Sequence, residues 1–86
     1  MIEKRTAARF RVLKGGTVAI DGGSIPGTVR NMSSTGAAVE FAQAVDLPPT
    51  FTLVIERDRF ARRCRPGRRN ERRVGTAFCQ SLFIRQ

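Results

Sequence analysis

Histidine, tryptophan and tyrosine are absent from the 86 residues, and only two cysteines occur. Without histidine the chain has no imidazole base and no imidazole metal ligand, which removes the commonest parts of hydrolytic and zinc sites. Cys64 and Cys79 form no C-x-x-C pair and are too few for a disulfide scaffold, so we interpret them as buried thiols. Because no nucleophile-base pair and no metal-ligand set is recognisable, we expect no enzymatic activity, no metal and no cofactor.

Long hydrophobic runs are also missing. The segment from Met1 to Lys14 carries charges throughout and lacks the apolar stretch of a signal peptide. No window is long and apolar enough for a membrane span. We therefore expect a cytoplasmic protein without a membrane span, and the length allows one small domain with one modest core.

Basic charge is what the sequence has in excess, with a formal net charge of +9. Residues 1–14 hold five basic residues and one acid, and residues 57–73 hold nine arginines and two acids. The remainder is slightly acidic. This excess predicts an anionic partner, but the charge alone leaves phosphate, nucleic acid and anionic lipid open.

Between the basic segments the sequence is typical of short β-strands separated by turns. Six segments carry alternating or strand-forming residues: Thr17–Ile20, Gly27–Ser33, Ala37–Phe41, Phe51–Glu56, Phe60–Arg65 and Val74–Phe78. Glycine-rich turns are expected at residues 21–24 and 34–36, and a loop at residues 66–71. So many short strands in a small chain favour an all-β fold, a closed or partly closed six-stranded antiparallel barrel that leaves few edges exposed.

These elements predict three parts: a flexible basic arm with its lead-in (residues 1–16), a barrel (residues 17–78) and a short tail (residues 79–86). Strict alternation places Val29, Asn31 and Ser33 on one face of their strand. Two polar side chains are thus expected where an apolar face would otherwise continue.

Two short patterns are candidates for a binding site. The first is Arg5-Thr6-Ala7-Ala8-Arg9, and the second is Asn31-Met32-Ser33-Ser34-Thr35-Gly36. In this order they resemble the Arg-x-x-x-Arg and Asp/Asn-x-Ser-x-x-Gly signature of the PilZ domain, a bacterial receptor module for the second messenger cyclic di-GMP. Further similarities lie at residues 11–16, 47–48 and 74–78, so that the resemblance runs from about residue 3 to residue 78.

The resemblance implies a role for each motif residue. Arg5 and Arg9 would clamp a phosphate and the Hoogsteen edge of guanine, since guanidinium can fork onto either. Asn31 would accept hydrogen bonds from guanine N1 and N2, Ser33 would hydrogen-bond the polar rim of the ligand, and Gly36 would give the ligand clearance. Ligand binding would then order the arm against the barrel and change a surface that a partner protein reads.

Two positions depart from the commoner family pattern. Lys4 stands where many PilZ domains have arginine, so it is an accessory candidate, and the number of ligand molecules bound stays open. Asn31 replaces the commoner aspartate and removes a negative charge that would pair with guanine N1 and N2.

Other interpretations of these residues also stay open. Arg5 and Arg9 could belong to a solvated basic tail, and Asn31, Ser33 and Gly36 could be simple turn residues. A different function is nucleic-acid binding through the Arg57–Arg73 segment, although stacking aromatics are scarce. A third is a PilZ fold that serves only as a protein adaptor. Binding of cyclic di-GMP and of a protein partner of unknown identity is the leading expectation.

Overall fold

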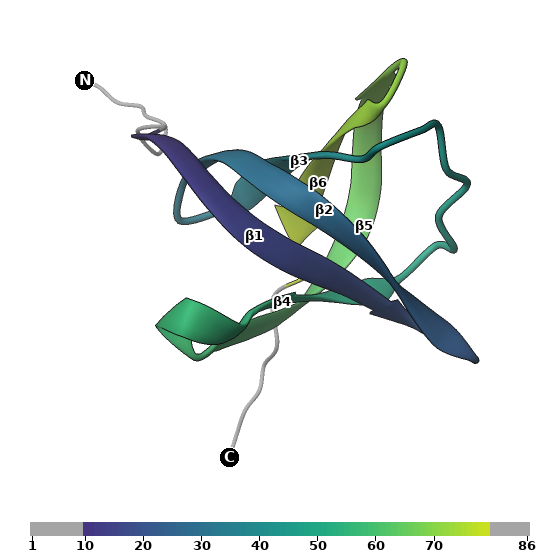
Figure 1. Ribbon diagram of the computed structural model, residues 1–86, viewed down its shortest axis with the longest axis horizontal. Coiled ribbons are helices and arrows are strands. Elements are labelled where there is room, and N and C mark those ends of the chain that lie inside the picture. Colours follow the sequence, from purple (N-terminus) through teal and green to yellow (C-terminus); the bar gives the residue numbers. More distant parts are fainter. Residues whose placement is uncertain (1–9, 80–86) are drawn as a thin grey trace.

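The computed structural model describes residues 10–79 of the chain, which fold into six strands and one short helix (Figure 1). Two-residue turns close two of the hairpins, β1-β2 and β5-β6. Their bounds are β1 Phe10–Ile20, β2 Gly23–Met32, β3 Gly36–Glu40, β4 Phe51–Ile55, β5 Phe60–Asn70 and β6 Arg73–Phe78, with the 3₁₀-helix η1 at Glu56–Asp58 between β4 and β5.

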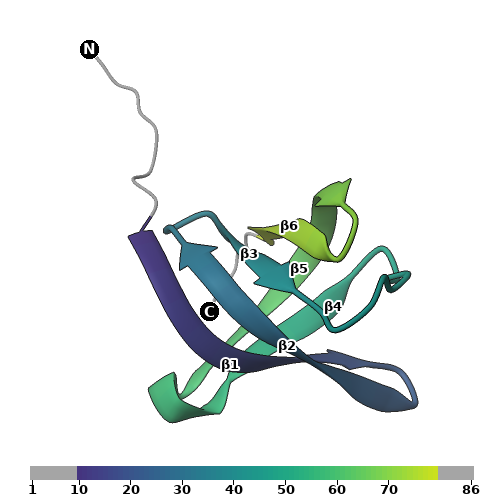
Figure 2. The ribbon, with the colours of Figure 1, turned by 45° about the horizontal axis from the view of Figure 1, so that its top comes forward.

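All strand pairs are antiparallel, and the sheet closes into a barrel in the order β1-β2-β3-β6-β5-β4. Closure occurs where Thr17–Ala19 of β1 pairs with Thr52–Val54 of β4. Figure 2 shows the long β1-β2 hairpin crossing in front of the β5-β6 hairpin, with the short β3 between β2 and β6. The predicted all-β, six-stranded antiparallel barrel is thereby confirmed.

The core is formed by alternate side chains from every strand. Val18, Val29, Leu53 and Ile55 are completely buried, and Cys64 is buried with them. These residues come from β1, β2, β4 and β5, whose inward-facing positions recur with the period of two that a half-buried strand requires. The described residues therefore share one continuous core inside the barrel.

The turn between β1 and β2 has the geometry that its glycines predict. Ile20 pairs with Gly23, so Asp21 and Gly22 form a two-residue loop, and Gly22 adopts a φ of 83°. This left-handed conformation is sterically free only for glycine.

Three strand boundaries differ by several residues from those expected from the sequence. β2 begins at Gly23 and not at Gly27, so Gly23 and Ser24 pair with β1 and only Asp21 and Gly22 are left in the turn. β1 begins at Phe10, so residues 10–16 belong to the barrel and not to the arm. β5 runs without interruption to Asn70, across the residues expected to form a loop. There Gly67 and Arg68 together oppose Gly75, a β-bulge that absorbs the extra residue while the ladder continues. The expected arm residues 1–9 and tail residues 80–86 lie outside the described part.

The interpretation of Cys64 as a packed thiol is supported by its surroundings. Its side chain is completely buried, and burial raises the pKa of the thiol above its ordinary value of 9.0, against smaller opposing effects of hydrogen bonds from Leu53 and Thr76. A raised pKa disfavours the reactive thiolate. Cys79 is only half-buried.

Residues 10–79 contain no helix of the length and apolar character needed to cross a membrane. The same residues contain no group of three or more His, Cys, Asp or Glu side chains that could hold a metal ion.

Candidate functional site

A β-bulge in β2 decides where Asn31 points. Val29 pairs with Val39 of β3, but Asn31 pairs with Ala38, so Arg30 between them has no counterpart on β3. Paired residues of an antiparallel ladder share a face, and Val39 lies in the core. Asn31 therefore points outward while Val29 points inward, and the prediction that Val29, Asn31 and Ser33 share one face is wrong.

Ser33 holds the turn between β2 and β3 together. Its Oγ accepts hydrogen bonds from the backbone N–H groups of Thr35, at 3.1 Å, and Gly36, at 3.2 Å. The backbone N–H of Ser33 donates to the carbonyl oxygen of Gly36 at 2.9 Å. This is the turn chemistry considered above as an alternative, and it gives Ser33 a structural role whether or not a ligand is bound.

The role of Ser33 leads to a stability prediction. Ser33→Ala is expected to lower the free energy of unfolding by about 1 kcal/mol, because two backbone donors lose their acceptor. Urea denaturation followed by circular dichroism measures this change. Ser34→Ala is the matched control, since Ser34 is exposed and its side chain makes no hydrogen bond with residues 10–79. Equal midpoints for the two variants would contradict the assigned role.

Gly36 is required by close contact between β3 and β6. A Cβ atom at this position would lie 2.1 Å from the carbonyl oxygen of Thr76 and 3.2 Å from its carbonyl carbon. The neighbouring Thr35 carbonyl accepts a hydrogen bond from the Phe78 N–H at 2.8 Å, which fixes the turn against β6. The motif glycine therefore has a packing reason within the barrel itself.

The outer surface of the barrel is hollowed beside Asn31. The depression has a volume of about 550 Å³, and its floor consists of Ala38 on β3, Gly75 on β6 and Gly67 on β5. Ala38 pairs directly with Gly75, and Gly67 lies in the bulge opposite Gly75. Because these residues have at most one side-chain carbon, a ligand can approach the backbone of three neighbouring strands.

Polar side chains surround this floor. Asn31 lies on the β2 side, and Arg68, Asn70 and Arg73 belong to the β5-β6 hairpin. No acidic side chain lines the depression. A second depression, at the far end of the β1-β2 hairpin, differs in this respect because Asp21 and Asp46 line it together with Arg63. The depression beside Asn31 is the one of these two that suits an anion.

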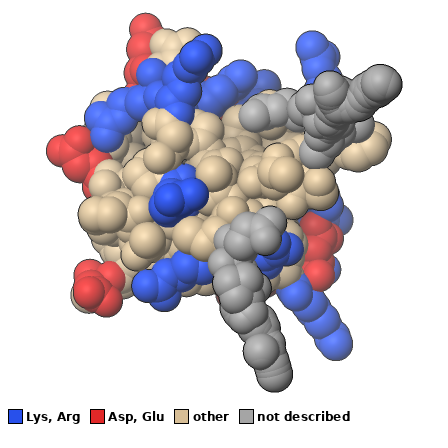
Figure 3. Space-filling model, turned by 180° about the vertical axis from the view of Figure 1, so that it is seen from behind, with Lys and Arg blue, Asp and Glu red and all other residues tan. Residues whose placement is uncertain are grey.

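Basic side chains are spread unevenly over the molecule. Seen from behind, they gather in the upper part and along the lower edge, with a largely uncharged surface between (Figure 3). The β5-β6 hairpin, whose tip is at the upper right in Figure 1, lies at the upper left in this view. The hairpin thus contributes to the positive potential of the upper part.

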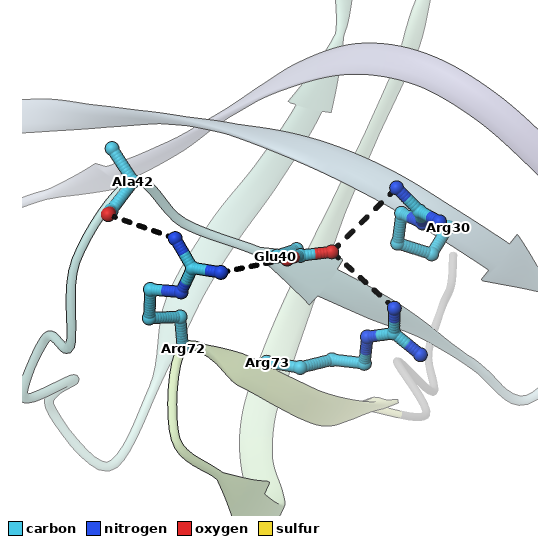
Figure 4. Close-up of polar contacts among 5 residues, drawn as sticks. All are labelled: Arg30, Glu40, Ala42, Arg72 and Arg73. Atoms are coloured by element: carbon cyan, nitrogen blue, oxygen red, sulfur yellow. Dashed lines mark hydrogen bonds and ion pairs between the residues drawn. The ribbon is translucent and has the colours of Figure 1, made fainter.

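One carboxylate organises several of these arginines. Glu40, at the end of β3, is within 3.3 Å of Arg73 and 3.6 Å of both Arg30 and Arg72 (Figure 4). Arg72 also donates to the carbonyl oxygen of Ala42 at 3.4 Å. Three guanidinium groups share a single negative charge, so the cluster stays positive.

Other arginines of the Arg57–Arg73 segment also have partners in the fold. Arg69 pairs with Asp46 at 3.0 Å, and Arg63 donates to Thr50 Oγ1 at 3.4 Å. The guanidinium of Arg62 lies 5.0 Å from the centre of the Phe78 ring, a cation-π contact. Part of the basic segment thus has structural contacts that its composition does not reveal.

The motif residues are separated by the structure into different roles. Asn31 lines the depression, whereas Ser33 and Gly36 shape the adjoining turn and do not line it. Arg5, Arg9 and the accessory candidate Lys4 lie outside the described residues. Sequence reasoning missed the contribution of the hairpin residues Arg68, Asn70 and Arg73, although Gly67 within a strand-like segment is a signal for a bulge.

Together, the closed barrel and the outward-facing asparagine beside a basic depression define a small all-β domain with a candidate binding site on its outer face. The family model of the PilZ domain matches residues 3–84, nearly the whole chain, and the protein belongs to this family. PilZ domains form a family of cyclic di-GMP receptors. A comparison with curated proteins gives no match.

Proposed function

We propose that this PilZ protein binds cyclic di-GMP on the outer face of its barrel and signals by contact with a partner protein. The observation that carries the proposal is the bulge at Arg30, which turns Asn31 outward beside a depression lined by arginines and no acid. Ser33 and Gly36 fix the turn after β2 and so keep the end of β2 in register, with Asn31 beside the depression.

The chemistry of these groups suits a cyclic dinucleotide. The ligand has two phosphodiesters and two guanines, and guanidinium can form bidentate hydrogen bonds with phosphate oxygens or with guanine O6 and N7. The side-chain carbonyl of Asn31 can accept from guanine N1 and N2. Arg5 and Arg9, which match the family signature, add two further guanidinium groups.

The position of the Arg-x-x-x-Arg motif in the chain supports a conformational response to the ligand. Phe10 begins β1, and Arg11 of that strand pairs with Asn31 of β2, so the chain enters the barrel next to the site. Arg9 and Arg5 precede this point by one and five residues, and an arm ordered by the ligand would cover the surface beside Asn31. That change is what a partner protein would read.

Isothermal titration calorimetry with cyclic di-GMP tests the proposal. We expect the wild type to bind, and Arg9→Ala to bind about tenfold to a hundredfold more weakly, as for the loss of one bidentate arginine contact. Arg57→Ala is the matched control, because Arg57 is exposed and on η1, away from Asn31.

A wild type that does not bind cyclic di-GMP would refute the function. Equal weakening by Arg9→Ala and Arg57→Ala would show that net charge alone, and not the signature arginine, controls binding. Nucleic-acid binding that falls steeply with salt and is unchanged by Arg5→Ala with Arg9→Ala would favour the alternative function of the basic hairpin.

A further inference from the structure

The β5-β6 hairpin contributes side chains to the depression from a part of the chain that lies outside the two PilZ motifs. We infer that this depression holds one guanine-phosphate half of cyclic di-GMP, with Arg68 and Arg73 as direct ligand contacts in addition to the motif residues. The inference rests on the proposed function and extends its site from β2 across β3 and β6 to β5.

The shape of the depression is set by small residues in register. Ala38 and Gly75 are ladder partners on β3 and β6, and the bulge at Gly67 brings β5 alongside them. A Cβ at Gly67 would lie 3.1 Å from the Gly75 carbonyl oxygen, so the bulge packs closely on β6. The resulting floor is nearly flat, because its residues have at most one side-chain carbon each. A flat floor suits the face of a planar base.

The volume of the depression, about 550 Å³, is of the size that small ligands occupy. Pockets for small molecules typically enclose ~300–1,000 Å³ and combine an apolar surface with a few polar groups. Here the apolar surface is the floor, and the polar groups are two guanidiniums and the amides of Asn31 and Asn70. Guanidiniums can meet phosphate or the guanine Hoogsteen edge, and amides can meet the Watson–Crick edge.

The two arginines differ in how they are held. Arg73 donates to Glu40 of the neighbouring strand β3 at 3.3 Å, which directs its guanidinium from β6 toward β3, but Glu40 is shared with Arg30 and Arg72. Arg73 therefore keeps positive charge for a ligand phosphate. Arg68, in the bulge, has no hydrogen bond or ion pair with residues 10–79 and is exposed. Its guanidinium is available to a ligand without breaking an existing contact.

The bulge explains why Arg68 belongs to this site. In a regular ladder only one residue of β5 would face Gly75, and the side chains would alternate between core and solvent. Two residues, Gly67 and Arg68, face it here, so a glycine on the floor is followed at once by an arginine at the rim. On the β2 side of the depression, the bulge at Arg30 also changes which side chain faces outward, and there it turns Asn31 outward.

Two variants test the inference against cyclic di-GMP by calorimetry. Gly75→Val fills the floor, and its Cβ would meet only ordinary contacts, the nearest being the Arg68 carbonyl oxygen at 3.5 Å. We expect it to weaken binding by at least about tenfold, and Arg68→Ala to weaken it by about tenfold, the loss of one guanidinium contact. Circular dichroism spectra matching the wild type show that the barrel is retained.

Two matched control variants separate a loss of ligand contacts from the general effects of added side-chain volume and of removed positive charge. Ala61→Val adds the same kind of bulk to an exposed position on β5, and Arg65→Ala removes one exposed arginine from the same strand outside the depression. Both controls are expected to bind like the wild type. In a ¹H–¹⁵N spectrum of the wild type, the amides of Gly67, Arg68 and Gly75 are expected to shift on titration with cyclic di-GMP.

The outcomes distinguish the inference from the proposed function. If the wild type binds and Arg9→Ala binds weakly, but Gly75→Val and Arg68→Ala bind like their controls, the ligand lies elsewhere and the inference is wrong. If the wild type shows no binding, the proposed function fails and the inference fails with it. Unshifted amides at Gly67 and Gly75 in a wild type that binds would also overturn the inference.

Discussion

Gly36→Ala is expected to lower the free energy of unfolding by at least about 3 kcal/mol, at the upper end of the cost of overfilling a packed site. The added Cβ would lie 2.1 Å from the Thr76 carbonyl oxygen and 3.4 Å from the Ala77 Cα. Both atoms belong to the backbone of β6, so no side-chain rotation can relieve the contact. The pairing of β3 with β6 must loosen, and this pairing is one of the six that close the barrel.

Urea denaturation monitored by circular dichroism measures the effect of Gly36→Ala. Gly15→Ala is the control, because a Cβ at Gly15 would meet no atom within 4 Å and the residue has no positive φ. Removing glycine at such a position is neutral or slightly stabilising, since it reduces the freedom of the unfolded chain. If both variants unfold at the wild-type midpoint, β3 and β6 do not approach as closely as described.

Leu53→Ala is the second change with a large expected effect. Leu53 is completely buried at the centre of β4, whose flanking partners are β1 and β5. Truncating a buried leucine typically costs about 2–5 kcal/mol, because the lost apolar contacts leave a cavity. Small domains have a total stability of only about 5–15 kcal/mol, so this variant would lose a large share of its stability.

Val54→Ala is the control for Leu53→Ala within the same strand. Val54 is half-buried, and it alternates with Leu53 so that its side chain lies on the other face of β4. Its truncation is expected to cost no more than about 1 kcal/mol. Thermal or urea unfolding measures the free energy of unfolding of both variants. Similar decreases in Leu53→Ala and Val54→Ala would mean that the barrel interior is not the main source of stability.

The six-stranded barrel could be predicted from the sequence because its determinants are local. Alternation around Leu53 and Val74 marks strands, and the glycines after Asp21 mark a hairpin turn. Bulges could not be predicted in this way. Pro66 and Gly67 form a pair typical of a turn, but pairing with β6 keeps them in a strand. The ladder partner that imposes this conformation is about ten residues away in the sequence.

The candidate site could be predicted only where its residues form a contiguous pattern. Asn31, Ser33 and Gly36 were identified from their spacing, but the spacing did not separate the outward-facing asparagine from the two residues that build the turn. Arg68 and Arg73 could not be selected among nine arginines of residues 57–73, because their position beside Asn31 depends on the register of β6 between β3 and β5.

The bulge at Arg30 makes the composition of the outer surface depend on strand length. Beyond it, Asn31 faces outward and Met32 packs against the core, because β2 contains one residue more than the facing stretch of β3. A chain one residue shorter here would carry the same amino acids with the two faces exchanged, the amide inside and the thioether in water. Insertions and deletions, more than substitutions, are therefore the sequence changes that could create or remove this recognition surface.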